Sequence, residues 1–146
     1  MIYKTQPDNF NPKFEVVSCY IEHDGDILIL HRQDHKPEGN TWGLPAGKID
    51  ADENELDAMV REVGEETGIN IEPEELEYLE KLYVVYPDYQ FIFHMFKIVL
   101  EEKPVIKISD CEHKAYQWLK PADILKLDLI PDFDECLKIS YAKLLK

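Results

Sequence analysis

The segment GKIDADENELDAMVREVGEETGI, residues 47–69, decides how this chain is organised. It holds eight acidic residues and one arginine. Like charges one helical turn apart repel each other by roughly 0.2–0.5 kcal/mol per pair. Such a concentration of carboxylates therefore needs something that offsets its electrostatic cost.

The periodicity of this segment predicts an amphipathic helix over residues 53–67. Asp52 is the expected N-cap, and Gly68 follows as the expected C-terminal capping residue. The apolar stripe has the i, i+3, i+4, i+7 spacing of a helix face that packs on a core, and it consists of Leu56, Met59, Val60 and Val63. The acidic residues therefore lie on the sides of the helix that this stripe leaves free.

Glu62, Glu65 and Glu66 are neighbours on one such side, because residues three and four apart meet on a helix surface. Arg61 lies one turn before Glu65 and can orient the carboxylates around it. Clustered carboxylates suit a hard cation such as Mg²⁺ or Mn²⁺. The alternative is an acidic face in contact with solvent. A calcium loop is excluded, because Glu55 stands where such a loop needs glycine.

The composition is that of a globular protein with one domain, residues 1–146. The net charge of −14 argues against a nucleic-acid polymer or an anionic membrane surface as partner. No apolar run is long enough to span a bilayer, and the first residues lack a signal-peptide pattern. The three cysteines are widely spaced, which favours reduced thiols and a cytoplasmic location. The chain is expected to be a monomer or a homodimer.

Strand and helix signals alternate along the rest of the chain and predict a mixed β-sheet with helices packed on it, an α/β fold. Residues 91–100 are apolar on both faces, which predicts a central strand. Other strands are expected at 14–22, 26–32, 76–86 and 114–119. Helices are expected at 121–127 and 131–146.

The spacing of residues 47–69 resembles the Nudix box at each defining position. The matching residues are Gly47, Glu53, Arg61, Glu62, Val63, Glu65, Glu66, Gly68 and Ile69. The flanking segments WGLPAGK (42–48) and EHKAYQWL (112–119) also look like their counterparts in that family. The resemblance implies the Nudix fold, an α/β/α sandwich, and hydrolysis of a nucleoside diphosphate linked to another group.

The resemblance also implies roles for individual residues. Glu62, Glu65 and Glu66 match the metal-binding glutamates, and Gly47 matches a glycine whose carbonyl often joins them. Glu53 and Arg61 match a supporting pair. Glu112 resembles a late-loop acid that binds metal or acts as base in some members; an ordinary exposed acid is the alternative. The general base stays open among Glu65, Glu66 and Glu112.

The substrate is less visible in the sequence. Aromatic residues that can stack on a base, or simply fill a core, are Phe10, Tyr83, Tyr86, Tyr89, Phe91 and Phe93; among them Tyr86 and Phe93 are the expected substrate contacts. The WGLPAGK lead-in resembles MutT-like enzymes, which implies a nucleoside triphosphate as substrate. Tyr86 alone resembles a tyrosine that dinucleoside polyphosphate hydrolases of this family tend to have at this spacing, which implies that substrate instead. A catalytically silent nucleotide-binding domain is the remaining alternative.

Overall fold

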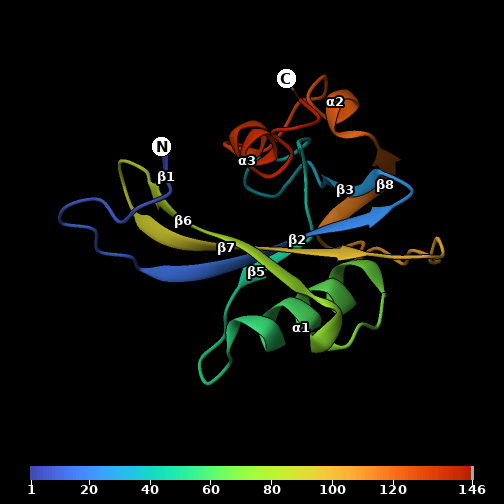
Figure 1. The fold of residues 1–146 in the computed structure, drawn as a ribbon, viewed down its shortest axis with the longest axis horizontal. Coiled ribbons are helices and arrows are strands. Elements are labelled where there is room, and N and C mark those ends of the chain that lie inside the picture. Colours follow the sequence, from blue (N-terminus) through green and yellow to red (C-terminus); the bar gives the residue numbers. More distant parts are fainter. Residues whose placement is uncertain (146) are drawn as a thin grey trace.

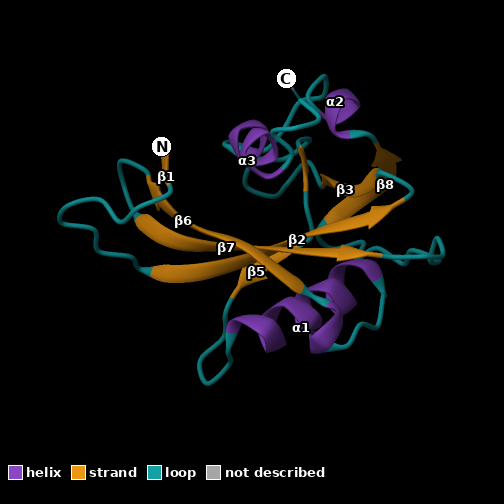
Figure 2. Cartoon of the chain, in the orientation of Figure 1, coloured by secondary structure: helices purple, strands orange, loops and turns teal. Residues whose placement is uncertain are grey.

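The computed structural model describes residues 1–145 as a sheet covered on both faces (Figures 1 and 2). Helix α1 covers one face, and α2 and α3 cover the other. The helices are α1 (Glu55–Thr67), α2 (Pro121–Ile124), α3 (Phe133–Ser140) and a short 3₁₀ helix at Pro73–Glu75. The strands are β1 (Ile2–Tyr3), β2 (Phe14–His23), β3 (Asp26–Arg32), β4 (Trp42–Gly43), β5 (Ala46–Lys48), β6 (Glu77–Val85), β7 (Gln90–Val99) and β8 (His113–Leu119). The predicted α/β/α sandwich is confirmed.

The sheet is mixed, as the sequence predicts. Its strand order is β1-β6-β7-β2-β3-β4, with β5 paired to β2 and β8 paired to β3. Strands β2 and β7 run parallel over nine residue pairs, whereas the other pairs are antiparallel. β7 lies between β6 and β2, so the expectation that this apolar strand is central is confirmed.

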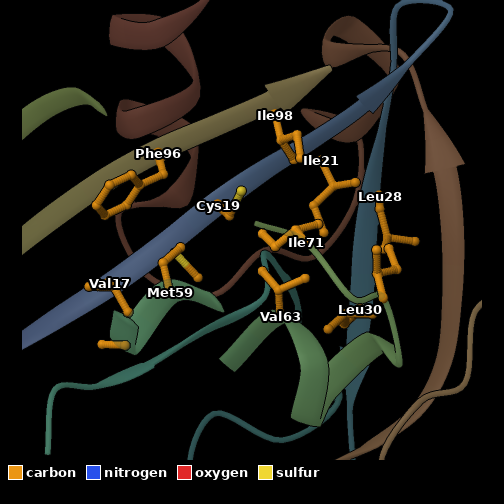
Figure 3. Packing of buried hydrophobic residues seen from close by; sticks show 12 residues of the cluster. Val17, Cys19, Ile21, Leu28, Leu30, Met59, Val63, Ile71, Phe96 and Ile98 are labelled. Carbon is orange, nitrogen blue, oxygen red and sulfur yellow. The ribbon is translucent and has the colours of Figure 1, made fainter. Parts of the chain in front are cut away.

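Alternation along the strands divides the core into two layers. On the α1 side, Val17 and Cys19 of β2 pack with Met59 and Val63 of α1 (Figure 3). On the opposite side, Tyr20 of β2 packs in a second cluster with residues of α3. The sheet therefore presents two faces with different partners.

Helix α1 starts two residues later than predicted. Asn54, rather than Asp52, is the N-cap, and its side chain accepts a hydrogen bond of 2.8 Å from the Asp57 amide. Asp52 instead adopts a left-handed turn conformation with φ 69°. The helix ends at Gly68, as predicted, with φ 76°. Leu56 is 40% exposed, so the first residue of the predicted apolar stripe is not buried in the core.

The two C-terminal helices are shorter than predicted. After α2 the chain leaves the helix, and Leu127, Leu129 and Ile130 pack on the second cluster from an irregular segment. α3 begins after Asp132, whose left-handed backbone is not helical, and ends before the buried Tyr141; of the predicted helix, residue 146 lies outside the described residues. Within residues 1–145, no helix has the length and apolarity required to cross a membrane.

Candidate active site

Arg61 organises the acidic residues around the start of α1. Its Nε and Nη2 donate to both oxygens of Glu53, at 2.8 and 2.9 Å. Its Nη1 donates to Glu62 at 2.8 Å and to Glu65 at 3.2 Å, and Nη2 also reaches the Lys48 carbonyl at 3.1 Å. One guanidinium thus connects three carboxylates and ties α1 to β5.

Glu53 is the most strongly stabilised carboxylate of this network. The hydrogen bonds from Arg61, followed by one from the Asp50 amide, lower the pKa of Glu53 to about 2. Glu53 and Arg61 therefore pair directly in the structure, and their supporting role at the site stays a prediction.

The lowered pKa of Glu53 predicts acid sensitivity. In an unfolded chain the pKa of glutamate is about 4.3. The stabilisation of the fold by ionised Glu53 is therefore complete above that pH. It is lost as pH falls toward the folded pKa of about 2. We expect the unfolding free energy of Glu53→Gln, measured by urea titration, to depend less on pH across this window. Equal pH slopes for both proteins would contradict the expectation.

Gly47 leaves room for the buried Glu62 side chain. A Cβ atom at Gly47 would overlap the Glu62 carboxylate group itself. Glu62 is 8% exposed, and burial raises its pKa although the Arg61 guanidinium opposes that effect. The box glycine therefore gives the Glu62 carboxylate the space that it occupies between β5 and α1.

Glu66 is the most deeply buried acid of the box, at 5% exposure. It accepts a hydrogen bond of 3.0 Å from the Ala46 amide. Burial raises its pKa well above the usual range, and the charges of Glu62 and Glu112 raise it further. Glu65 differs, because its side chain is 59% exposed and pairs with Arg61. The structure thus separates one exposed box glutamate from two buried ones.

Glu112 reaches this site from the loop before β8. The loop is held to the end of β3 by a hydrogen bond of 2.9 Å from the Gln33 amide to the Glu112 carbonyl. A carboxylate oxygen of Glu112 then lies within 4.8 Å of one from Glu66. The structure therefore brings together two acids that are far apart in the sequence.

His113 also lies at this site, and the sequence analysis missed it. One of its ring nitrogens is within 4.8 Å of the Glu66 and Glu112 oxygens. The side chain is 3% exposed, and burial lowers its pKa to about 4. Among residues 1–145, its Nδ1 has no hydrogen-bond partner. The available signal was its place beside Glu112 at the start of a predicted strand.

A cavity of about 500 Å³ opens beside Glu66, on the sheet face opposite the apolar side of α1. Its aromatic wall is formed by Tyr86, Tyr89, Phe91 and Phe93, and its polar lining includes Ser18, Arg32, Glu38, Glu66, His113 and Asp132. The two expected substrate contacts, Tyr86 and Phe93, are thus both in the cavity wall. Its size and lining suit a small organic ligand with one planar group.

Two of the six aromatic candidates do not line this cavity. Phe10 and Tyr83 pack edge to face with each other, with ring centroids 5.2 Å apart. Successive residues of a strand point to opposite faces, so Val84 of β6 points into the cavity and Tyr83 points away from it. Of the two alternatives for these aromatic residues, Phe10 and Tyr83 show packing against other side chains rather than a place in the cavity wall.

Asp132 forms a polar end of the cavity that the sequence analysis did not identify. The Tyr86 hydroxyl donates a hydrogen bond of 2.7 Å to its carboxylate. Asp132 has φ 69°, an uncommon backbone conformation for a residue other than glycine. Its second carboxylate oxygen makes no hydrogen bond within the described part of the chain and can accept one from a ligand.

Comparisons with known proteins agree with this geometry. The family model for the NUDIX domain matches residues 12–138. The CTP pyrophosphohydrolase of Escherichia coli (strain K12) is 29% identical over 119 residues, which cover 80% of this chain and 83% of the relative.

Two solved structures have a similar fold. The MutT protein of Methanosarcina mazei Go1 superposes with a TM-score of 0.77 at 24% identity, covering 92% of this chain and 97% of the other. A bifunctional NMN adenylyltransferase/ADP ribose pyrophosphatase from Francisella tularensis, complexed with AMP and a Mn ion, gives 0.72 at 26% identity. That match covers 92% of this chain and 43% of the larger protein. With its box residues assembled around one buried carboxylate site, the chain belongs to the Nudix family of hydrolases.

Proposed function

We propose that this enzyme hydrolyses a nucleoside triphosphate to the monophosphate and pyrophosphate, with Mg²⁺ or Mn²⁺ as cofactor. The observation that carries the proposal is a group of carboxylates beside an aromatic-lined cavity. Glu66 is buried and lines the cavity, the charge of the buried Glu62 acts on it, and an oxygen of the half-buried Glu112 lies within 4.8 Å of a Glu66 oxygen. A nucleoside fits the cavity, and its phosphates then lie beside the carboxylates.

The residues present fit a divalent cation. Glu62 and Glu66 are buried; besides burial, the charges of Glu65 and Glu112 raise the pKa of Glu62, and the charge of Glu62 raises the pKa of Glu66. Oxygen donors at this density match the ligands that Mg²⁺ and Mn²⁺ prefer. Glu62, Glu65, Glu66 and the carbonyl of Gly47 are the proposed ligands. A bound cation supplies charge neutralisation at the phosphates and a more acidic water.

The protein contributes positioning and electrostatics. Arg61 and Glu53 orient Glu62 and Glu65 through the hydrogen bonds described above. Glu66 lines the cavity and an oxygen of Glu112 lies within 4.8 Å of a Glu66 oxygen, which favours these two over the exposed Glu65 as the group that accepts a proton from water. Arg32 lines the same cavity, and its permanent positive charge can pair with a phosphate.

The cavity lining supports a base as the recognised group. Phe91 and Phe93 provide apolar ring surface, and the Asp132 carboxylate can accept a hydrogen bond from an exocyclic amino group. A relative with 29% identity is named for CTP, a nucleotide with such an amino group. A cytidine or another amino-bearing triphosphate is therefore the first substrate to test.

A nucleotide panel tests the substrate. Wild-type enzyme with Mg²⁺ or Mn²⁺ is incubated with standard and oxidised triphosphates, ADP-ribose and diadenosine tetraphosphate, and the products are separated by chromatography. We expect monophosphate and pyrophosphate from at least one triphosphate. A kcat/KM for diadenosine tetraphosphate about tenfold above that for each triphosphate, roughly 1.4 kcal/mol in transition-state binding, would favour the dinucleoside alternative. No cleavage of any nucleotide would favour a silent binding domain.

Metal binding should stabilise the fold. A cation that binds only the folded state raises stability by RT ln(1 + [L]/Kd), or about 2.7 kcal/mol at a hundred times Kd. We therefore expect a higher Tm with millimolar Mg²⁺ or Mn²⁺ than with EDTA, measured by calorimetry. Glu62→Gln removes the charge of one proposed ligand, so the addition of metal should raise its Tm by less. Identical Tm values with EDTA and with metal, also in the presence of nucleotide, would argue against this site.

A further inference from the structure

His113 is a polar side chain inside the active site without a described function. It is 3% exposed and lines the cavity beside Glu66. Its Nδ1 has no partner within residues 1–145, although a buried nitrogen without a hydrogen bond is unfavourable by about 1–3 kcal/mol. A buried imidazole of this kind needs a partner that is not part of the chain itself.

The local backbone explains why His113 and Glu112 both reach Glu66. Adjacent residues of a regular strand point to opposite faces. The β3–β8 ladder, however, is irregular where β8 begins, with a register shift between His31 and Arg32. Such irregularities redirect side chains and are common beside active sites. A ring nitrogen of His113 and oxygens of Glu66 and Glu112 thereby converge within 4.8 Å of one another.

We propose that His113 supplies a nitrogen ligand to a divalent cation held by Glu66 and Glu112, so that the site prefers first-row transition-metal ions such as Mn²⁺ to Mg²⁺. This inference rests on the proposed metal-dependent function and adds a ligand that the Nudix box does not contain. The resulting donor set is one imidazole nitrogen and two carboxylates, with the other box glutamates available nearby.

The preference follows from the chemistry of the ligands. Mg²⁺ takes oxygen ligands and keeps several of its waters. Imidazole binds first-row transition-metal ions, whose affinity for mixed nitrogen and oxygen sites rises from Mn²⁺ toward Cu²⁺. Replacing one oxygen donor by His113 therefore penalises Mg²⁺ relative to Mn²⁺. The side chain is neutral in this role, so it adds no positive charge beside Arg32.

Pulsed EPR of bound Mn²⁺ provides a direct readout that does not depend on turnover. A nitrogen bound to Mn²⁺ gives a ¹⁴N modulation, which changes to a ¹⁵N modulation when the protein is made with ¹⁵N-histidine. We expect this modulation in the wild-type chain and its loss in His113→Gln. The matched control is His35→Gln at an exposed loop position, which should retain it.

Calorimetric titration then measures selectivity. We expect His113→Gln to raise the Kd for Mn²⁺ about tenfold or more, since substitutions at metal sites typically weaken metal affinity by about 10–100-fold. The Kd for Mg²⁺ should rise by less than about twofold. Circular dichroism checks that the variant folds. If it does not fold, His94→Gln decides instead, because His94 lies with Glu15 and Glu55 in the other group of described residues that could hold a metal. Coupling that persists in His94→Gln supports His113 as the ligand, and coupling that is lost there overturns it.

The possible failures are distinguishable. Stoichiometric Mn²⁺ binding without histidine nitrogen coupling overturns the role of His113 and leaves metal-dependent hydrolysis intact. Coupling that persists in folded His113→Gln also overturns it. A wild-type chain that binds no Mn²⁺ and hydrolyses no nucleotide overturns this inference together with the proposed function.

Discussion

Replacing Glu66 by glutamine is expected to lower turnover by a hundredfold or more, on the order of 3 kcal/mol of transition-state stabilisation. Glutamine keeps the shape of the side chain and can still accept the hydrogen bond from the Ala46 amide. It loses the negative charge that holds a cation beside the cavity. Turnover is measured with the best nucleotide of the panel at saturating metal.

The same substitution is expected to stabilise the metal-free protein. Burial raises the pKa of Glu66 in the folded state, so the free energy of unfolding falls as pH rises from the unfolded-state pKa of about 4.3, and the loss is complete above the folded-state pKa. Glutamine removes this penalty, and its effect should vanish below the unfolded-state pKa, where Glu66 is protonated in both states. In a domain of this size, 1 kcal/mol corresponds to a Tm change of about 2–4 °C. Calorimetry in EDTA at neutral pH measures it.

A fall in turnover together with a rise in the Tm of the metal-free protein would indicate that the Glu66 charge serves the reaction rather than the stability of the fold. Glu74→Gln removes the same charge at an exposed position and should change neither turnover nor the Tm appreciably. Glu65→Gln should also lower turnover if Glu65 is a metal ligand, although its exposed carboxylate has a smaller effect on metal-free stability. If Glu66→Gln folds and turns over within about threefold of wild type, less than 1 kcal/mol, the proposed metal site is wrong.

Gly47→Ala is expected to have the second-largest effect. The added methyl group occupies the position of the Glu62 carboxylate, so either β5 or the glutamate must move. A movement of about 1 Å in a positioning group can lower a rate by roughly a hundredfold. We expect turnover to fall by about that factor, with a weaker stabilisation by metal in calorimetry.

Gly64→Ala is the matched control within the same motif. A Cβ at Gly64 would lie 3.9 Å from the Ile69 carbonyl oxygen, an ordinary van der Waals distance. Alanine in a helix interior is more favourable than glycine by about 0.5–1 kcal/mol. This variant should therefore be more stable and fully active. Equal activities of the two alanine variants would show that the space at Gly47 is not needed for the reaction.

The features that the sequence predicted well depend on local geometry. Glu62, Glu65 and Arg61 are within one turn of each other on a helix, so their spacing alone places them together. Gly68 ends α1 because a left-handed residue suits glycine. The alternation of strand and helix signals along the chain likewise predicted a mixed sheet, and the apolar character of β7 predicted its central place. The predicted N-cap Asp52 was wrong, because the side chain of Asn54 two residues later takes that position.

The substrate side of the site was decided by the tertiary structure. Glu112 and His113 meet Glu66 only because β8 pairs with β3 and because that ladder is irregular at its start. Tyr86 meets Asp132 only when α3 packs over the sheet. Tyr83 and Phe93 are both aromatic strand residues, and the register of β6 on β7 decides which of them faces the cavity. Motif spacing and periodicity fix positions along one element, whereas a cavity is enclosed by elements whose relative placement depends on long-range packing.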